Sequence, residues 1–177
     1  MAIELVPSVS RGVKLRYKGI FDFQELWRLV HDWLESKSFE VTEPKAKHKM
    51  LTFGEELEAV LFGWRNVTDY YRFEMKVYAK YWDGQYVEVV QNGQKKKKVK
   101  ARMFIIVSGK FILDYSDRFT KTKFSQALGN FMNKYVLRWQ WDSVYGDQLN
   151  YKVLELQNVI KEFLDMEAKG SEYADMW

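Results

Sequence analysis

Alternation of apolar residues with mostly charged residues over positions 72–81 is the feature that most constrains the fold of this chain. In YYRFEMKVYAKYW, every odd position from Phe73 to Tyr81 carries an apolar or aromatic side chain. The intervening charged residues are Arg72, Glu74, Lys76 and Lys80. A period of two is that of a β-strand with one buried and one solvated face. The segment therefore predicts a strand that covers a core on one side only.

A second alternating segment covers residues 99–115, where every odd position except Gly109 is apolar or aromatic. Asn92-Gly93 precedes it and favours a type I′ turn, because both turn positions need positive φ. We therefore predict a long hairpin. Its expected cross-strand pairs are Glu88 with Lys97 and Val90 with Lys95. Gly109, inside the second arm, predicts a bulge or bend.

Three segments have the period of an amphipathic helix. The first, 21–37, has Asp22 in position to cap it, Glu25 to complete a capping box, and Phe21 with Leu26 as a hydrophobic staple. The other two, 121–139 and 149–167, each present one apolar face. The second of these faces comprises Leu149, Val153, Leu156, Ile160, Phe163 and Leu164.

The remaining strand signals are shorter. Residues 12–19 and 55–67 each predict a strand, and residues 39–51 predict two strand-like pieces interrupted by Pro44, which suits a sheet edge or a bend. Strands grouped between helical regions predict an α+β fold, an antiparallel β-sheet with an N-terminal helix and two C-terminal helices packed on one face. We expect a single domain over residues 1–168 and a C-terminal arm over 169–177.

This order of elements resembles that of helix-grip proteins of the START and Bet v 1 kind, in which a curved antiparallel sheet wraps a helix. That resemblance implies an apolar cavity between sheet and helix. The stretches GIFDFQELWRLVHDWL and IKEFLDMEAK also resemble segments of uncharacterised small proteins from archaeal and viral metagenomic sequence. This second resemblance implies neither an activity nor catalytic residues.

Composition excludes some classes of site. The chain has no Cys, so disulfides, thiolate zinc sites and cysteine nucleophiles are excluded. It lacks an apolar run long enough to span a bilayer and a recognisable signal peptide, which predicts a cytoplasmic protein without membrane insertion, or one carried in a virion. Its 17% aromatic content predicts a large core, a pocket or an interface.

Catalytic patterns are weak. His31 and His48 form no metal-binding motif, and His31 lies beside the apolar face of the first helix. Glu55, Glu56 and Glu58 have the composition of a solvated acidic patch. We therefore predict a protein that is not an enzyme and has no catalytic residues, metal or cofactor.

Basic residues are concentrated at one place, the start of the second hairpin arm: Lys95, Lys96, Lys97, Lys98, Lys100 and Arg102. One interpretation is a basic ribbon that binds nucleic acid through counterion release. The other is that these lysines keep an exposed strand soluble and prevent edge-to-edge pairing. Both interpretations stay open at the level of sequence.

The tail KGSEYADMW contains Tyr173, Met176 and Trp177, residue types that are enriched at protein interfaces. We therefore predict a non-enzymatic binding protein that self-associates into a homo-oligomer or larger assembly through this arm. The alternatives are nucleic-acid binding through residues 91–102 and binding of an apolar ligand between sheet and helix.

Overall fold

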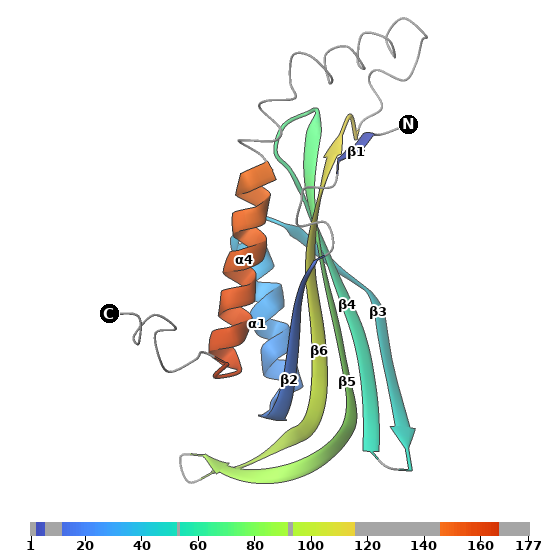
Figure 1. The fold of residues 1–177 in the computed structure, drawn as a ribbon, viewed down its shortest axis with the longest axis vertical. Coiled ribbons are helices and arrows are strands. Elements are labelled where there is room, and N and C mark those ends of the chain that lie inside the picture. The colour runs from blue at the N-terminus through green and yellow to red at the C-terminus, as the bar shows by residue number, and fades with distance from the viewer. Residues whose placement is uncertain (1–2, 6–11, 53, 92–93, 116–145, 167–177) are drawn as a thin grey trace, which may run out of the picture.

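A computed structural model describes residues 3–5, 12–52, 54–91, 94–115 and 146–166 (Figure 1). The elements in chain order are β1 (Ile3–Leu5), β2 (Val13–Phe21), α1 (Phe23–Ser36), β3 (Glu40–Leu51), β4 (Gly54–Asn66), β5 (Tyr71–Gln91), β6 (Gln94–Leu113) and α4 (Gly146–Phe163). Strands and helices are segregated along the chain, so the predicted α+β class is confirmed.

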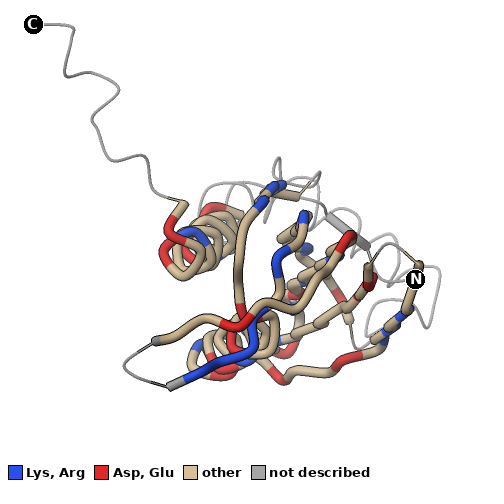
Figure 2. Tube along the Cα trace, turned by 90° about the horizontal axis from the view of Figure 1, so that it is seen from below, with Lys and Arg blue, Asp and Glu red and all other residues tan. Residues whose placement is uncertain are grey.

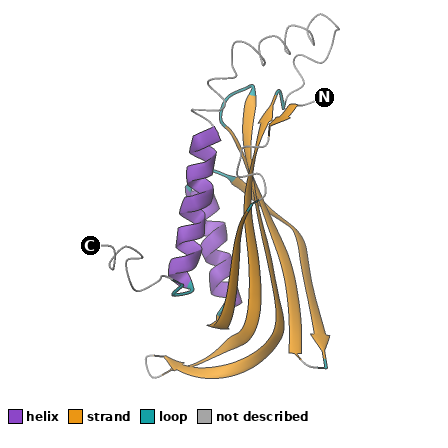
Figure 3. Ribbon diagram, viewed as in Figure 1, coloured by secondary structure: helices purple, strands orange, loops and turns teal. Residues whose placement is uncertain are grey.

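The strands form one six-stranded antiparallel sheet in the order β1-β6-β5-β4-β3, and β2 also pairs with β6. β2 lies along residues 99–107 of β6, and β1 lies along residues 111–113. The sheet is strongly curved, and both described helices lie on its concave side (Figure 3). The opposite, convex face is not covered by either of these helices.

The core fills the space between the concave face and the two helices. Odd-numbered residues of β6 and of residues 73–81 of β5 point into it, and Met75, Val77 and Val107 are fully buried there. From the helices, Leu34 and Leu156 are equally inaccessible to solvent. The alternation seen in the sequence thus separates a buried concave face from a solvated convex face.

The hairpin of β5 and β6 has the predicted register, with Glu88 opposite Lys97 and Val90 opposite Lys95. The turn residues 92–93 lie outside the described residues. The register shifts between Trp82 and Gln85, so the irregularity in this hairpin lies in β5. Asp83 within it has a φ of 59°, a left-handed conformation that a bulge accommodates.

Gly109 is predicted to mark a bulge or bend, and the structure has no bulge there. Gly109 pairs regularly with Met75 in the ladder. A Cβ atom at this position would lie 3.0 Å from Leu149 Cγ and 3.1 Å from Val153 Cγ2. The glycine therefore lets helix α4 approach the sheet closely, which is the other role that glycine has in a strand.

Helix α1 begins at Asp22, the N-cap that its sequence predicts. The Asp22 carboxylate accepts hydrogen bonds from the backbone N–H groups of Gln24 and Glu25, each at 3.0 Å. Phe21 and Leu26, the staple residues, are both buried. The Glu25 side chain pairs with Lys96 at 3.5 Å, an interaction with the hairpin that local helix signals do not predict.

Helix α4 confirms the last predicted helix. Leu149, Val153, Leu156 and Ile160 are buried, whereas Phe163 is 36% exposed and is not part of the core. The other predicted C-terminal helix, over residues 121–139, lies outside the described residues. The described part of the chain thus contains one C-terminal helix where we expected two.

Two of the shorter strand signals, residues 39–51 and 55–67, correspond to β3 and β4. Residues 55–67 form most of β4, as predicted. Residues 40–51 form one strand, β3, in place of two pieces, and a register shift between Thr42 and Lys45 accommodates Pro44. β3 is at the end of the strand order, so the predicted edge position is confirmed.

Candidate nucleic-acid interface

The convex face is built from the even-numbered residues of β2, β6 and β5, which the register aligns in rows across the sheet. One row contains Lys18, Arg102 and Trp82. The next row along the strands contains Arg16, Phe104 and Lys80. Cations and aromatic rings therefore lie next to one another on this face, on neighbouring strands about 4.8 Å apart.

Five cations form what we call the basic strip: Lys14, Arg16, Lys18, Lys100 and Arg102. All five are exposed. Among the residues that the structure describes, no carboxylate lies within ion-pair distance of the first four. Arg102 is different, because its Nε donates a hydrogen bond of 2.8 Å to Asp83 Oδ2. The basic strip is thus a positively charged surface in which one cation, Arg102, is paired with a neighbouring carboxylate.

Two hollows, of about 500 and 520 Å³, lie on the basic strip. Lys18 and Arg102 line both of them. Trp82 and Phe104 line the first, which we call the aromatic hollow, and both rings are half-buried. The Arg102 guanidinium lies 5.5 Å from the centre of the Trp82 ring, in a cation–π arrangement.

The lysines of the hairpin continue the positive charge beyond the basic strip, as the blue stretch next to the grey hairpin turn shows in Figure 2. Lys95 lies 3.5 Å from Glu88, and Lys96 lies 3.5 Å from Glu25. Lys97 and Lys98 have no carboxylate within ion-pair distance in the described part of the chain. The structure thus pairs two of the six residues singled out in the sequence with glutamates and brings Lys100 and Arg102 to the sheet face.

The β3–β4 side of the convex face mixes lysines with carboxylates. Lys45 lies 2.5 Å from Glu58, and Lys80 lies 3.6 Å from Glu56. The hydrogen bond from Lys45 lowers the pKa of Glu58. A further hollow of about 410 Å³ lies here, lined by Phe62, Lys76 and other residues. The carboxylates of the convex face therefore lie mainly toward β3 and β4, whereas β2 contains no acidic residue.

Glu55 does not belong to a solvated acidic patch, so that interpretation is wrong for this residue. Its side chain is 2% exposed and points to the face opposite Glu56 and Glu58. Tyr81 donates a hydrogen bond of 2.6 Å to it, and His48 Nε2 lies at 2.8 Å. The carboxylate is thus enclosed by polar partners where β5 bends.

The ionisation of Glu55 follows from these contacts. Burial raises its pKa, but hydrogen bonds with Tyr81, His48 and Tyr86 outweigh burial, so its pKa lies below the usual value. Burial and the adjacent carboxylate together raise the pKa of the Tyr81 phenol. The charged carboxylate and the neutral phenol stabilise each other, which is the chemistry of a structural contact rather than of proton transfer.

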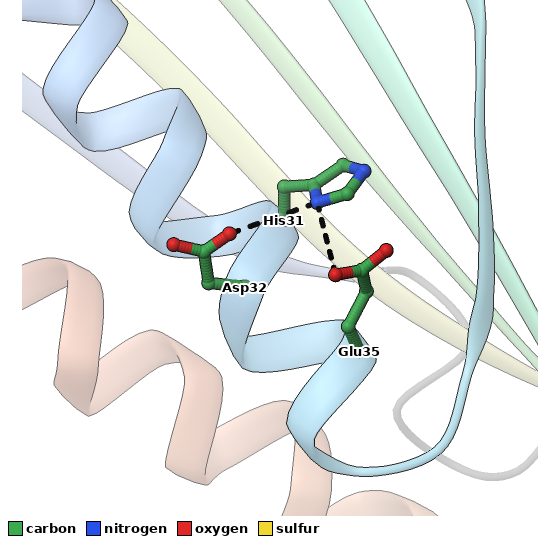
Figure 4. A group of neighbouring side chains, drawn as sticks. All are labelled: His31, Asp32 and Glu35. Carbon is green, nitrogen blue, oxygen red and sulfur yellow. Dashed lines mark ion pairs between the residues drawn. The ribbon is translucent and has the colours of Figure 1, made fainter.

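His31, Asp32 and Glu35 meet on the solvent side of α1 (Figure 4). His31 Nδ1 lies 3.8 Å from a carboxylate oxygen of each of the other two residues. Their spacing of one and four residues along a helix brings such side chains together without any ligand. The surface position of His31 on the helix explains this cluster.

Sequence reasoning missed most of the basic strip. Lys14, Arg16 and Lys18 lie in GVKLRYKG, where alternation with Val13, Leu15 and Tyr17 marks one solvated face. That pattern was a usable signal. It could not show that this strand lies beside residues 99–107 of β6, because pairing between distant segments is not encoded in the local period.

The predicted self-association residues Tyr173, Met176 and Trp177 lie outside the described residues. Neither described helix has the length and apolar character needed to cross a membrane.

Comparison of the chain with protein-family models, with curated proteins and with solved structures finds no match. Inference about function therefore depends on the residues of the convex face.

Proposed function

We propose that this protein binds nucleic acid through the convex face of its sheet, with the basic strip as the main contact and the lysine hairpin as an extension. The observation that carries the proposal is the basic strip itself, whose cations come from two strands far apart in sequence. Four of them have no acidic partner among the described residues.

Elementary electrostatics supports a polyanionic ligand. Lysine and arginine side chains that neutralise phosphates release condensed counterions, which favours binding at low salt. The chain as a whole has a formal charge of only +4, so the local excess of cations on one face matters more than the net charge. Half-buried aromatic rings between the cations offer contact surfaces for bases.

The alternative of an apolar ligand between sheet and helices has less support. The side chains that face that space, including Val77, Met75 and Ile160, are fully buried against one another. Close packing of this kind leaves little room for a ligand. The two hollows of the basic strip are instead open to the solvent side of the sheet.

A pair of double variants tests the proposal. Arg16→Gln/Lys18→Gln removes two charges from the basic strip on β2, and the matched control Lys47→Gln/Lys49→Gln removes two from β3 at the opposite edge. All four residues are exposed. Fluorescence anisotropy with labelled single-stranded and duplex oligonucleotides, at several salt concentrations, gives affinity and salt dependence.

We expect the strip variant to bind more weakly and to reduce the slope of log K against log salt by roughly 0.7 to 0.9 per lost phosphate contact. The control variant should retain most of the affinity and most of the salt dependence. A further variant with Lys95 to Lys98 changed to Gln measures the contribution of the hairpin. No binding of the unmodified protein to either oligonucleotide at low salt, or equal losses in strip variant and control, would contradict the proposal.

A further inference from the structure

We infer that the nucleic acid is single-stranded and that its bases stack on Trp82 and Phe104 in the aromatic hollow, while Arg16, Lys18 and Arg102 contact its phosphates. This inference rests on the proposed function and adds to it the class of ligand and the residues that contact the bases.

The geometry places rings and cations at adjacent positions. Trp82 is directly across from Arg102, which is directly across from Lys18. Phe104 is two residues from Arg102 along β6 and directly across from Arg16. The hollow between these side chains has a volume of about 500 Å³. A strand with exposed bases can therefore contact rings and cations at the same time, as other single-strand binding surfaces allow.

A duplex cannot reach these rings in the same way. Trp82 and Phe104 belong to β5 and β6, strands that have neighbours on both sides in a sheet of six strands. β1 and β2 pair with the same edge of β6, so the sheet is five strands across. At about 4.8 Å between strands, its outermost strands are roughly 19 Å apart, which is about one and a half times the width of the major groove of B-DNA. Both rings are also half-buried between longer charged side chains. The two rings therefore cannot contact bases that are stacked inside a duplex. They can contact the unstacked bases of a single strand.

In the unbound protein, the Arg102 side chain lies in the aromatic hollow. Its guanidinium covers the Trp82 ring and pairs with Asp83, so a carboxylate holds the cation that a phosphate would contact. A base that stacks on Trp82 displaces the guanidinium from the ring. Replacing Asp83 by Asn removes the competing charge and frees Arg102 for phosphate, so Asp83→Asn should bind single strands more tightly than the unmodified protein.

The experiment compares three probes in anisotropy measurements: a labelled oligo-dT of 20 nucleotides, an oligo-U of the same length and a duplex of 20 base pairs. The proteins are the unmodified chain, Trp82→Ala, Trp82→Phe, Phe104→Ala and the control Trp64→Ala. Trp64 is a half-buried ring on the β4 part of the same face. Circular dichroism verifies that each variant is folded.

We expect the single strands to bind more tightly than the duplex. Trp82→Ala and Phe104→Ala should each weaken single-strand binding by roughly ten-fold, Trp82→Phe should retain most of it, and Trp64→Ala should change it little. The oligo-dT and oligo-U probes distinguish DNA from RNA as the source of the strand. If Trp82→Ala does not fold, quenching of tryptophan fluorescence by oligo-dT should be smaller in Trp82→Phe than in the unmodified protein, and equal quenching would overturn the inference.

Other outcomes separate this inference from the proposed function. Equal affinity for duplex and single strand, with aromatic variants unchanged and the strip variant weakened, overturns the single-strand inference and leaves the proposed function intact. Binding to vesicles of anionic phospholipid without binding to any oligonucleotide overturns both.

Discussion

At the scale of single residues, Glu55 shows how burial and hydrogen bonding set a charge. The carboxylate is almost fully enclosed, yet hydrogen bonds with Tyr81 and His48 hold its pKa below the usual value of 4.5. A group whose pKa is lowered in the folded state contributes stability above its unfolded pKa. That contribution is lost as the pH falls through the folded pKa.

Glu55→Gln should therefore lower the free energy of unfolding at pH 7 by about 1–3 kcal/mol, since the buried hydrogen-bond network loses its negative charge and one of its two acceptor oxygens. Urea denaturation measures the change. The control Glu56→Gln removes a half-buried carboxylate from the opposite face and should change stability by less than about 1 kcal/mol. At pH values below the folded pKa, the stabilities of Glu55→Gln and the unmodified protein should converge, and a difference that does not change with pH would contradict this account.

At the scale of elements, the contact between α4 and β6 depends on a missing side chain. Leu149 and Val153 of α4 occupy the space where a Cβ atom of residue 109 would be. Gly63 on β4 faces the same core, but there a Cβ atom would lie at the ordinary distance of 3.4 Å from Phe39 Cβ. The two glycines therefore provide a matched comparison within one sheet face.

We expect Gly109→Ala to destabilise the fold by about 1–3 kcal/mol, because the added methyl group pushes α4 away from the sheet. Gly63→Ala should cost less, since its Cβ atom meets no closer neighbour. Thermal and urea unfolding of both variants measures the difference. A Gly63→Ala variant that is less stable than Gly109→Ala would show that the position of α4 does not depend on the glycine.

At the scale of the whole molecule, the sheet has two faces with different roles. The concave face holds both described helices and the core, and the convex face carries the basic strip and the aromatic hollow (Figure 3). Assembly of several copies is a separate proposal that depends on the predicted C-terminal arm with Tyr173, Met176 and Trp177.

Deletion of residues 169–177 tests that proposal. The buried residues of the last helix end at Leu164, so the truncated chain should retain its fold, with an unchanged circular dichroism spectrum. Light scattering should show the full chain as an oligomer and the truncated chain shifted toward monomer, because aromatic anchors contribute about 2 kcal/mol or more each at an interface. A full chain that is monomeric at high micromolar concentration, or a truncated chain that associates unchanged, would contradict self-association.

The sequence by itself determined the local structure of β5, β6 and the start of α1, and which side of β6 and of residues 73–81 of β5 is buried. The alternation in residues 70–82 and 99–115, the Asn92-Gly93 pair and the Asp22 cap predicted β5, β6, their register and the start of α1. These features depend on backbone conformations and side-chain periods that involve residues close together in the chain.

Only the tertiary structure decided which segments lie side by side. Arg16 and Lys18 became part of one surface with Arg102 through the pairing of β2 with β6. Glu55 became a buried carboxylate through contact with Tyr81, 26 residues away in the chain. Gly109 became the contact point of α4. The physical reason is the same in each case, because a local period specifies the face on which a side chain lies but not the strand or helix that faces it.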